Sequence, residues 1–205
     1  MRIILFIAGL CVFGLETFGQ HLPFAQALEK HREEYKVEFL KDPRSPLTAG
    51  DLKYIHFFTP DSSFRVMADF KPLEGEASFR MPTYDGSTKE YIRYGVASFT
   101  LNGKPLTLTI YRSIQLMSTE EYKDYLFLPF TDLTNTKETY GGGRYIDLTT
   151  SSVKNGKLEI DFNKAYNPYC AYSSGYSCPV PPEENDLPIA VTAGEMNYTG
   201  PKKKR

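Results

Sequence analysis

The chain has 205 residues, and its 24 Lys and Arg residues against 25 Asp and Glu residues give a formal net charge of −1 at pH 7. This balance gives no reason to expect nucleic acid or a strongly acidic partner, and the length suits one domain. The local exception is the basic tail, residues 201–205. We interpret it as a solvated terminus, with contact to a membrane surface or nucleic acid as the alternative.

Residues 1–19 have the features of an export signal. A basic start precedes an apolar run over residues 3–15, and small residues follow at Thr17 and Gly19. The apolar run is too short for a transmembrane helix. We therefore expect cleavage before Gln20, export to the periplasm or the extracellular space, and no membrane span after the signal is removed.

The domain that remains, residues 20–200, opens with an amphipathic helix over residues 23–42. One face of this helix carries residues spaced three or four positions apart, namely Phe24, Leu28, His31, Tyr35 and Phe39. Pro43 ends the helix, because it restricts the residue before it and has no N–H of its own.

From Tyr54 onward the sequence has the pattern of strands. Runs such as EYIRYGVASFTL, LTLTIYRSI and KLEIDF are rich in β-branched and aromatic residues and are separated by Gly, Pro and Asn. The Asn102-Gly103 and Asn155-Gly156 pairs are typical of tight hairpins. We predict a mainly β fold, an antiparallel barrel or sandwich with the N-terminal amphipathic helix packed against an end or an open face.

Four ordered motifs in the C-terminal half carry a family resemblance. They lie in FTDLTNTKETYGGGRYIDL, DFNKAYNPYCAY, CPVPPEENDL and TAGE, within residues 126–195. This region resembles an uncharacterised bacterial family, the domain of unknown function 1684. The resemblance implies no activity, and Asp186 departs from the basic residue that the family favours there, so no anion-binding role is implied at that position.

Cys170 and Cys178 lie eight positions apart in an aromatic-rich and proline-rich segment. In an exported chain this spacing favours a disulfide, which would brace a long C-terminal loop. Free or redox-active thiols and a metal site are the alternatives. The spacing is not C-x-x-C and no His lies nearby in the sequence, so we expect no metal and no cofactor.

A second group of residues forms a candidate ligand site at the end of the predicted strands. Arg144 follows three glycines and has two interpretations, a pair with a carboxylate such as Asp132, Asp161 or Glu195, or a contact with a ligand anion. The remaining candidates are polar residues that either fasten the long loop or line a pocket. The predicted ligand-binding set is Tyr140, Arg144, Asp161, Asn163, Asn167, Glu184 and Asn185.

Two functions from different classes fit these features. The first is a non-catalytic ligand-binding or structural module of the cell envelope, whose partner is a small molecule or an envelope component and not nucleic acid. The alternative is a hydrolase in which Asp161 and Glu184 act with Arg144 on an envelope ester, sugar or phosphate. No G-x-S-x-G motif is present to indicate a serine hydrolase.

Export gives a direct test of the N-terminal prediction. Mass spectrometry of the protein purified from its native host should find a mature chain that begins at Gln20. A mature chain that begins at Cys11 would indicate lipidation instead, and a chain that retains residues 1–19 would contradict export.

Overall fold

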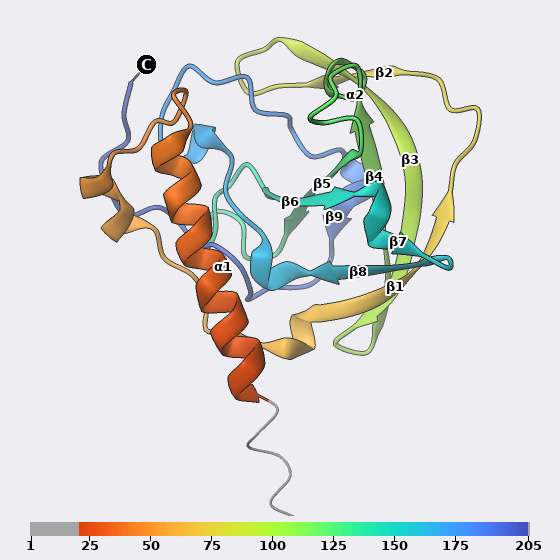
Figure 1. The fold of residues 1–205 in the computed structure, drawn as a ribbon, viewed down its shortest axis with the longest axis horizontal. Helices are drawn as coiled ribbons and strands as arrows, with labels where there is room; N and C mark the ends of the chain where they lie inside the picture. Colours follow the sequence, from red (N-terminus) through yellow and green to blue (C-terminus); the bar gives the residue numbers. More distant parts are fainter. Residues whose placement is uncertain (1–20, 205) are drawn as a thin grey trace, which may run out of the picture.

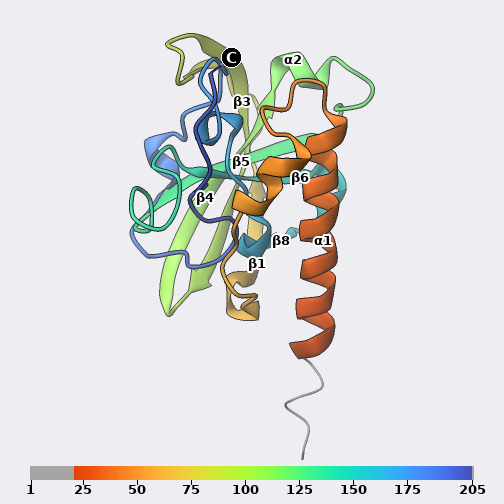
Figure 2. The same ribbon diagram turned by 90° about the vertical axis from the view of Figure 1, so that its left-hand side faces the viewer.

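The structure is a computed structural model that describes residues 21–204, so the predicted signal lies outside the described residues. The chain begins with α1 (His21–Lys41) and the 3-10 helix η1 (Ala49–Tyr54). Figures 1 and 2 show α1 running along one side of a large curved sheet. No helix within residues 21–204 is both long enough and apolar enough to cross a membrane.

Nine strands make up the sheet. They are β1 (Arg65–Pro72), β2 (Phe79–Pro82), β3 (Thr88–Leu101), β4 (Lys104–Ser113), β5 (Tyr125–Asp132), β6 (Arg144–Thr149), β7 (Val153–Lys154), β8 (Lys157–Asp161) and β9 (Asp186–Leu187). The short helix α2 (Ile114–Met117) joins β4 to β5. The remaining 3-10 helices of the described chain are η2 (Ser62–Phe64), η3 (Thr150–Ser152), η4 (Phe162–Lys164), η5 (Tyr169–Ala171) and η6 (Glu183–Asn185).

The strand order is β6-β5-β4-β3-β1-β8-β7, with β2 paired to β3 and β9 paired to β5. Every pair is antiparallel except β5 with β9. The mainly antiparallel β prediction is confirmed. The predicted barrel is not, because the sheet does not close: its two edge strands, β6 and β7, form no ladder with each other in the described chain.

Alternation along the strands explains where the main core lies. Leu108 and Ile110 of β4, Leu126 and Leu128 of β5, and Ile160 of β8 all point to one face of the curved sheet and are fully buried there. The two predicted Asn-Gly hairpins are present. Their residues have φ values of 52° and 75° in the first hairpin and 52° and 71° in the second, as a two-residue turn of this kind requires.

A second cluster lies on the opposite face, next to the point where β3 changes register between Arg93 and Gly95. A side chain at position 95 would collide with the Phe70 ring, since an added Cβ would lie 2.2 Å from its Cζ. Beyond this bulge, Tyr91 of β3 packs with aromatic residues of β4, β5 and β6. These aromatic residues include Tyr111, Phe127 and Tyr145.

The N-terminal helix packs as its sequence predicts. Leu28 and Phe39 are buried, and Tyr35 packs at the edge of a third cluster that contains Phe39 and Tyr172. Arg32, which the periodicity assigned to neither face, is also buried, and it donates to the Phe58 carbonyl at 2.7 Å. The helix therefore closes one side of the domain with aromatic and polar contacts together.

Candidate functional site

Arg144 points away from solvent, and its side chain is fully buried. It donates to Asp132 Oδ2 at 2.8 Å and to the Val191 carbonyl at 2.8 Å, and it also donates to the Ala193 carbonyl. Burial lowers the pKa of Arg144 and the charge of Asp132 opposes that shift, while an Arg side chain stays protonated in any case. The structure therefore supports the carboxylate-paired interpretation of Arg144, because it has no route to a ligand from solvent.

The three predicted amides are buried and bind main-chain groups of distant segments. Asn163 accepts from the Asp61 N–H at 3.0 Å and donates to its carbonyl at 2.8 Å. Asn167 donates to the Met196 carbonyl at 2.7 Å. These contacts fasten the segment after β8 to the chain that precedes β1 and to the C-terminal segment.

Asn185 has the most specific of these roles. Its amide accepts from the Thr109 N–H at 2.7 Å and donates to the carbonyls of Thr109 and Pro129. Pro129 has no N–H, so β4 and β5 cannot form a continuous ladder at this point. The Asn185 side chain takes the place of the missing main-chain partner between the two strands.

The two carboxylates of the predicted hydrolase contact different parts of the sheet. Glu184 accepts from Tyr111 of β4 at 2.9 Å and pairs with Arg93 of β3 at 3.0 Å. Asp161 ends β8 and accepts from the Asn163 side chain at 2.9 Å. No hydrogen bond or ion pair within residues 21–204 joins them, and Tyr140 packs separately, against Tyr84.

The disulfide prediction needs correction, since Cys170 and Cys178 are free thiols here. The Cys170 N–H donates to Cys178 Sγ at 3.2 Å, and Cys170 Sγ contacts the Tyr176 carbonyl at 3.1 Å. Hydrogen bonding between the two residues lowers the pKa of Cys170 and raises that of Cys178. The two residues lie close together, but the predicted covalent bond is absent. Covalent bonding also depends on an oxidant, which no sequence pattern specifies.

Glu195 is the centre of a fully buried polar network. Its carboxylate accepts from Tyr172 at 2.6 Å, from Tyr35 of α1 at 2.8 Å and from the Asn167 N–H at 2.9 Å. Burial raises the pKa of Glu195 to about 7, although these hydrogen bonds act in the opposite direction. The network joins α1 to the segment after β8, and through the Tyr35 and Tyr166 rings, 5.9 Å apart, it reaches the surface.

Asp147 on β6 is the functional candidate that sequence reasoning missed. Its Oδ1 accepts from the Tyr125 hydroxyl and from the Tyr166 hydroxyl, both at 2.7 Å. The side chain is nevertheless exposed to solvent. Loss of hydration among the surrounding groups raises the pKa of Asp147, and the hydrogen bonds from Tyr166 and Tyr125 act against that shift. A solvent-accessible carboxylate with a raised pKa, held by two tyrosines, has the properties of a ligand-contacting group.

Asp147 lies in a groove of about 750 Å³, between the outer edge of β6 and the part of β8 that extends beyond its pairing with β7. One wall comes from β6 and η3, and the other from β8 with Lys154 and Lys164 at its ends. Of the seven predicted ligand residues, Asp161 alone lines either of the two hollows described here. One feature of the sequence could have indicated Asp147. In RYIDL, alternation places this charged residue on the face of the strand that is opposite to Ile146 and Leu148, which face the core.

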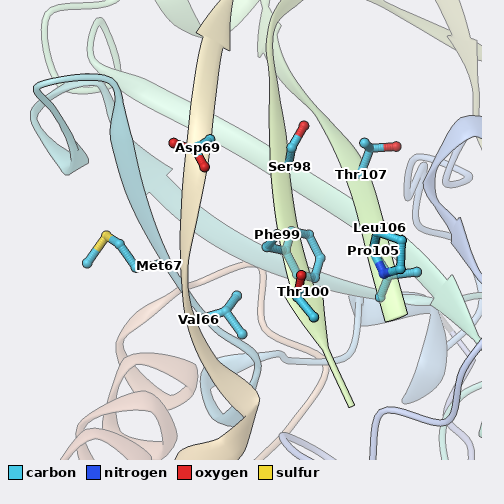
Figure 3. A pocket seen from close by; sticks show the side chains of 9 residues that line it. All are labelled: Val66, Met67, Asp69, Ser98, Phe99, Thr100, Pro105, Leu106 and Thr107. Carbon is cyan, nitrogen blue, oxygen red and sulfur yellow. The ribbon is translucent and has the colours of Figure 1, made fainter. Parts of the chain in front are cut away.

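The other hollow, of about 670 Å³, is an open gap between strands (Figure 3). Pairing between β1 and β3 extends only as far as Asp69 with Ser98. Beyond this pair, Val66 of β1 and Thr100 of β3 lie on separated strands. Its one charged lining residue, Asp69, already accepts from Lys157 at 2.6 Å. We therefore assign no ligand to this gap.

Fold and groove together define a mainly antiparallel β domain with an incomplete barrel and one polar groove at its open seam. Residues 51–196 match the family described as "Protein of unknown function (DUF1684)", and the chain belongs to this family, as the four motifs predict. The chain is similar to the solution NMR structure of an uncharacterised protein from Haloarcula marismortui. The two are 34% identical, the match covers 89% of this chain and 98% of that one, and the TM-score is 0.66. Comparison with curated proteins finds no match.

The buried ion pair leads to a stability prediction. Arg144→Lys keeps the charge but loses the planar fork that binds Asp132 and two carbonyls, so we expect a loss of unfolding free energy on the order of 2–4 kcal/mol. Urea unfolding measures this loss. The matched control is Arg44→Lys, whose partner Asp42 forms an ion pair near the surface, and which should change stability by less than about 1 kcal/mol. Equal effects would contradict the structural role of Arg144.

Glu195 leads to a pH prediction. Its folded-state pKa of about 7 lies above the ordinary value of 4.5, so its contribution is fully present below pH 4.5 and is lost as pH rises through 7. The loss should be on the order of 3 kcal/mol. Unfolding of wild type and Glu195→Gln across this range measures it, because the amide cannot ionise. The stability difference between the two proteins should shift in favour of the variant as pH rises; a constant difference would refute the assignment.

Proposed function

We propose that this protein is a non-catalytic binding module that holds a small polar ligand in the groove at Asp147. The observation that carries the proposal is the difference in hydrogen bonding between the two carboxylate oxygens of Asp147. Two tyrosine hydroxyls hold Oδ1, whereas Oδ2 has no hydrogen-bond partner among residues 21–204. Oδ2 is therefore positioned to accept from a hydroxyl or ammonium group of a ligand.

The surroundings of Asp147 support binding rather than simple surface exposure. Tyr125 belongs to β5 and Tyr166 to the segment after β8, so two separate parts of the fold fix one carboxylate. Holding the side chain in advance reduces the entropy that ligand binding must overcome. An ordinary surface carboxylate needs no such arrangement.

The hydrolase alternative has weaker support. It requires Asp161, Glu184 and Arg144 to act together, but Arg144 is fully buried against Asp132 and Glu184 is paired with Arg93. A role in the cell envelope is part of our proposal, and it rests on the sequence of residues 1–19 alone.

The proposal predicts a ligand response that depends on Asp147. In two-dimensional amide NMR spectra, a panel of amino acids, short peptides, hexoses and hexuronic acids at millimolar concentration should include at least one compound that shifts residues 146–148 and Glu159. Asp147→Asn should abolish these shifts, because the amide loses the anionic acceptor.

The matched control is Asp186→Asn. Asp186 is an exposed aspartate on β9 that also accepts from a hydroxyl, that of Thr131 at 2.8 Å, and it lies outside the groove. This variant should respond to the panel as wild type does. If no compound shifts the groove residues, or if Asp147→Asn leaves the shifts unchanged, the proposed function is wrong.

A further inference from the structure

The main chain of Asp147 points into the groove, as the pairing of β6 shows. Tyr145 lies opposite Pro129 of β5, which has no N–H. The Tyr145 main chain instead exchanges two hydrogen bonds with Tyr166, at 2.9 and 3.0 Å, on the side away from β5. Main-chain direction alternates along an antiparallel strand, so Asp147, two residues on, presents its N–H and C=O to the same side.

The opposite wall presents main-chain groups in the same way. Lys154 and Lys157 form the closing pair of the β7–β8 hairpin, so the main chain of Lys157 faces β7. On its other side β8 faces β1, where the Gly156 carbonyl accepts from Phe70 at 2.8 Å. By alternation, the main-chain N–H and C=O of Glu159 face the same side as those of Lys157. They have no partner in β7, because β7 pairs only with Lys157 and Leu158. The groove therefore lies between the outer edge of β6 and the part of β8 after Leu158, and neither has a ladder partner on the groove side in the described chain.

The part of the groove that lies between these two edges, called the slot below, is short. The Tyr145–Tyr166 bridge closes one end, and η3, which leads from β6 into β7, closes the other. Between these limits β6 has only Ile146, Asp147 and Leu148 along the groove. An unpaired strand edge is a template for another extended chain, and this one has room for a few residues only.

The slot carries a negative charge for the N-terminal ammonium group of such a chain and positive charges for its C-terminal carboxylate. Asp147 Oδ2 is available for an ammonium group. Lys154 and Lys164 also line the groove, and neither forms an ion pair with another residue of the described chain. Lys157, by contrast, is paired with Asp69.

We propose that the ligand is a short peptide that binds as an added strand between β6 and β8. Its main chain pairs with the open groups of Asp147 and Glu159, its N-terminal ammonium contacts Asp147 Oδ2, and its C-terminal carboxylate contacts one of the two lysines at the opposite ends of the groove, Lys154 or Lys164. This inference rests on the proposed binding function and specifies its ligand class. Recognition through the main chain and the two termini places few demands on the peptide's side chains.

Titration calorimetry with trialanine tests the peptide class. Wild type should bind trialanine, and N-acetylation of the peptide or Asp147→Asn should weaken binding by roughly 10–100-fold, because each removes a hydrogen bond to a charged group. The double variant Lys154→Met, Lys164→Met should weaken trialanine more than it weakens the C-terminal amide of the same peptide. Glu76→Gln, an exposed change in the β1–β2 loop, is the control and should leave binding unchanged.

A second peptide tests the added strand itself. Trialanine methylated on the amide nitrogen of its central residue keeps both charges but loses a main-chain donor. It should bind about tenfold more weakly than trialanine. Equal binding of the two peptides would overturn strand pairing. If sugars or single amino acids shift the groove residues and trialanine does not bind, the peptide class is wrong while the proposed function stands. If nothing in the panel reaches the groove, both are wrong.

Discussion

The buried pair between Arg144 and Asp132 is the interaction on which the rest of the structure depends. Both side chains are fully buried, and Arg144 also binds carbonyls of the segment that leads to Glu195. Asp132 accepts in addition from the Val191 N–H at 3.1 Å. A pair of this kind is costly to break, because either partner left alone is an uncompensated buried charge. It therefore fixes the 191–195 segment against β5 and β6.

A continuous set of contacts leads from that pair to the groove. Glu195, at the end of the fixed segment, binds Tyr35 of α1 and the Asn167 N–H. The Tyr35 ring packs on Tyr166, and the Tyr166 hydroxyl holds Asp147. The exposed carboxylate at the groove is thus positioned by groups that lie deep in the domain. Rigid support of this type is what a binding group needs if it is to act in a fixed geometry.

The incomplete barrel gives the groove its chemical character. Proteins generally protect strand edges, because unpaired N–H and C=O groups invite further strands. Here β6 and β8 face each other without pairing, and the Tyr145–Tyr166 bridge and η3 limit the opening to a short slot. An aromatic cluster beneath β4, β5 and β6 supports the same edge from the side opposite the main core. The seam is therefore bounded at both ends and polar between them.

The sequence by itself determined the local features of this protein. The three- and four-residue spacing from Phe24 to Phe39 predicted α1, the Asn-Gly pairs predicted two hairpins, and four motifs predicted the family. Each of these depends on residues close together in the chain, where periodicity and turn chemistry act directly. The carboxylate partner of Arg144 was among the predicted alternatives, because a charged group in a β domain needs a counter-charge.

Only the tertiary structure decided which polar residues meet. Asp147, Tyr125 and Tyr166 come from three segments, and no pattern within one segment shows that two hydroxyls share one oxygen. The predicted ligand residues Asn163, Asn167 and Asn185 are instead used to bind main-chain groups. Whether the sheet closes was also beyond the sequence, because closure depends on strand register, stagger and tilt summed around the whole sheet. Those quantities are set by packing between distant strands, so the groove exists only once the chain has folded.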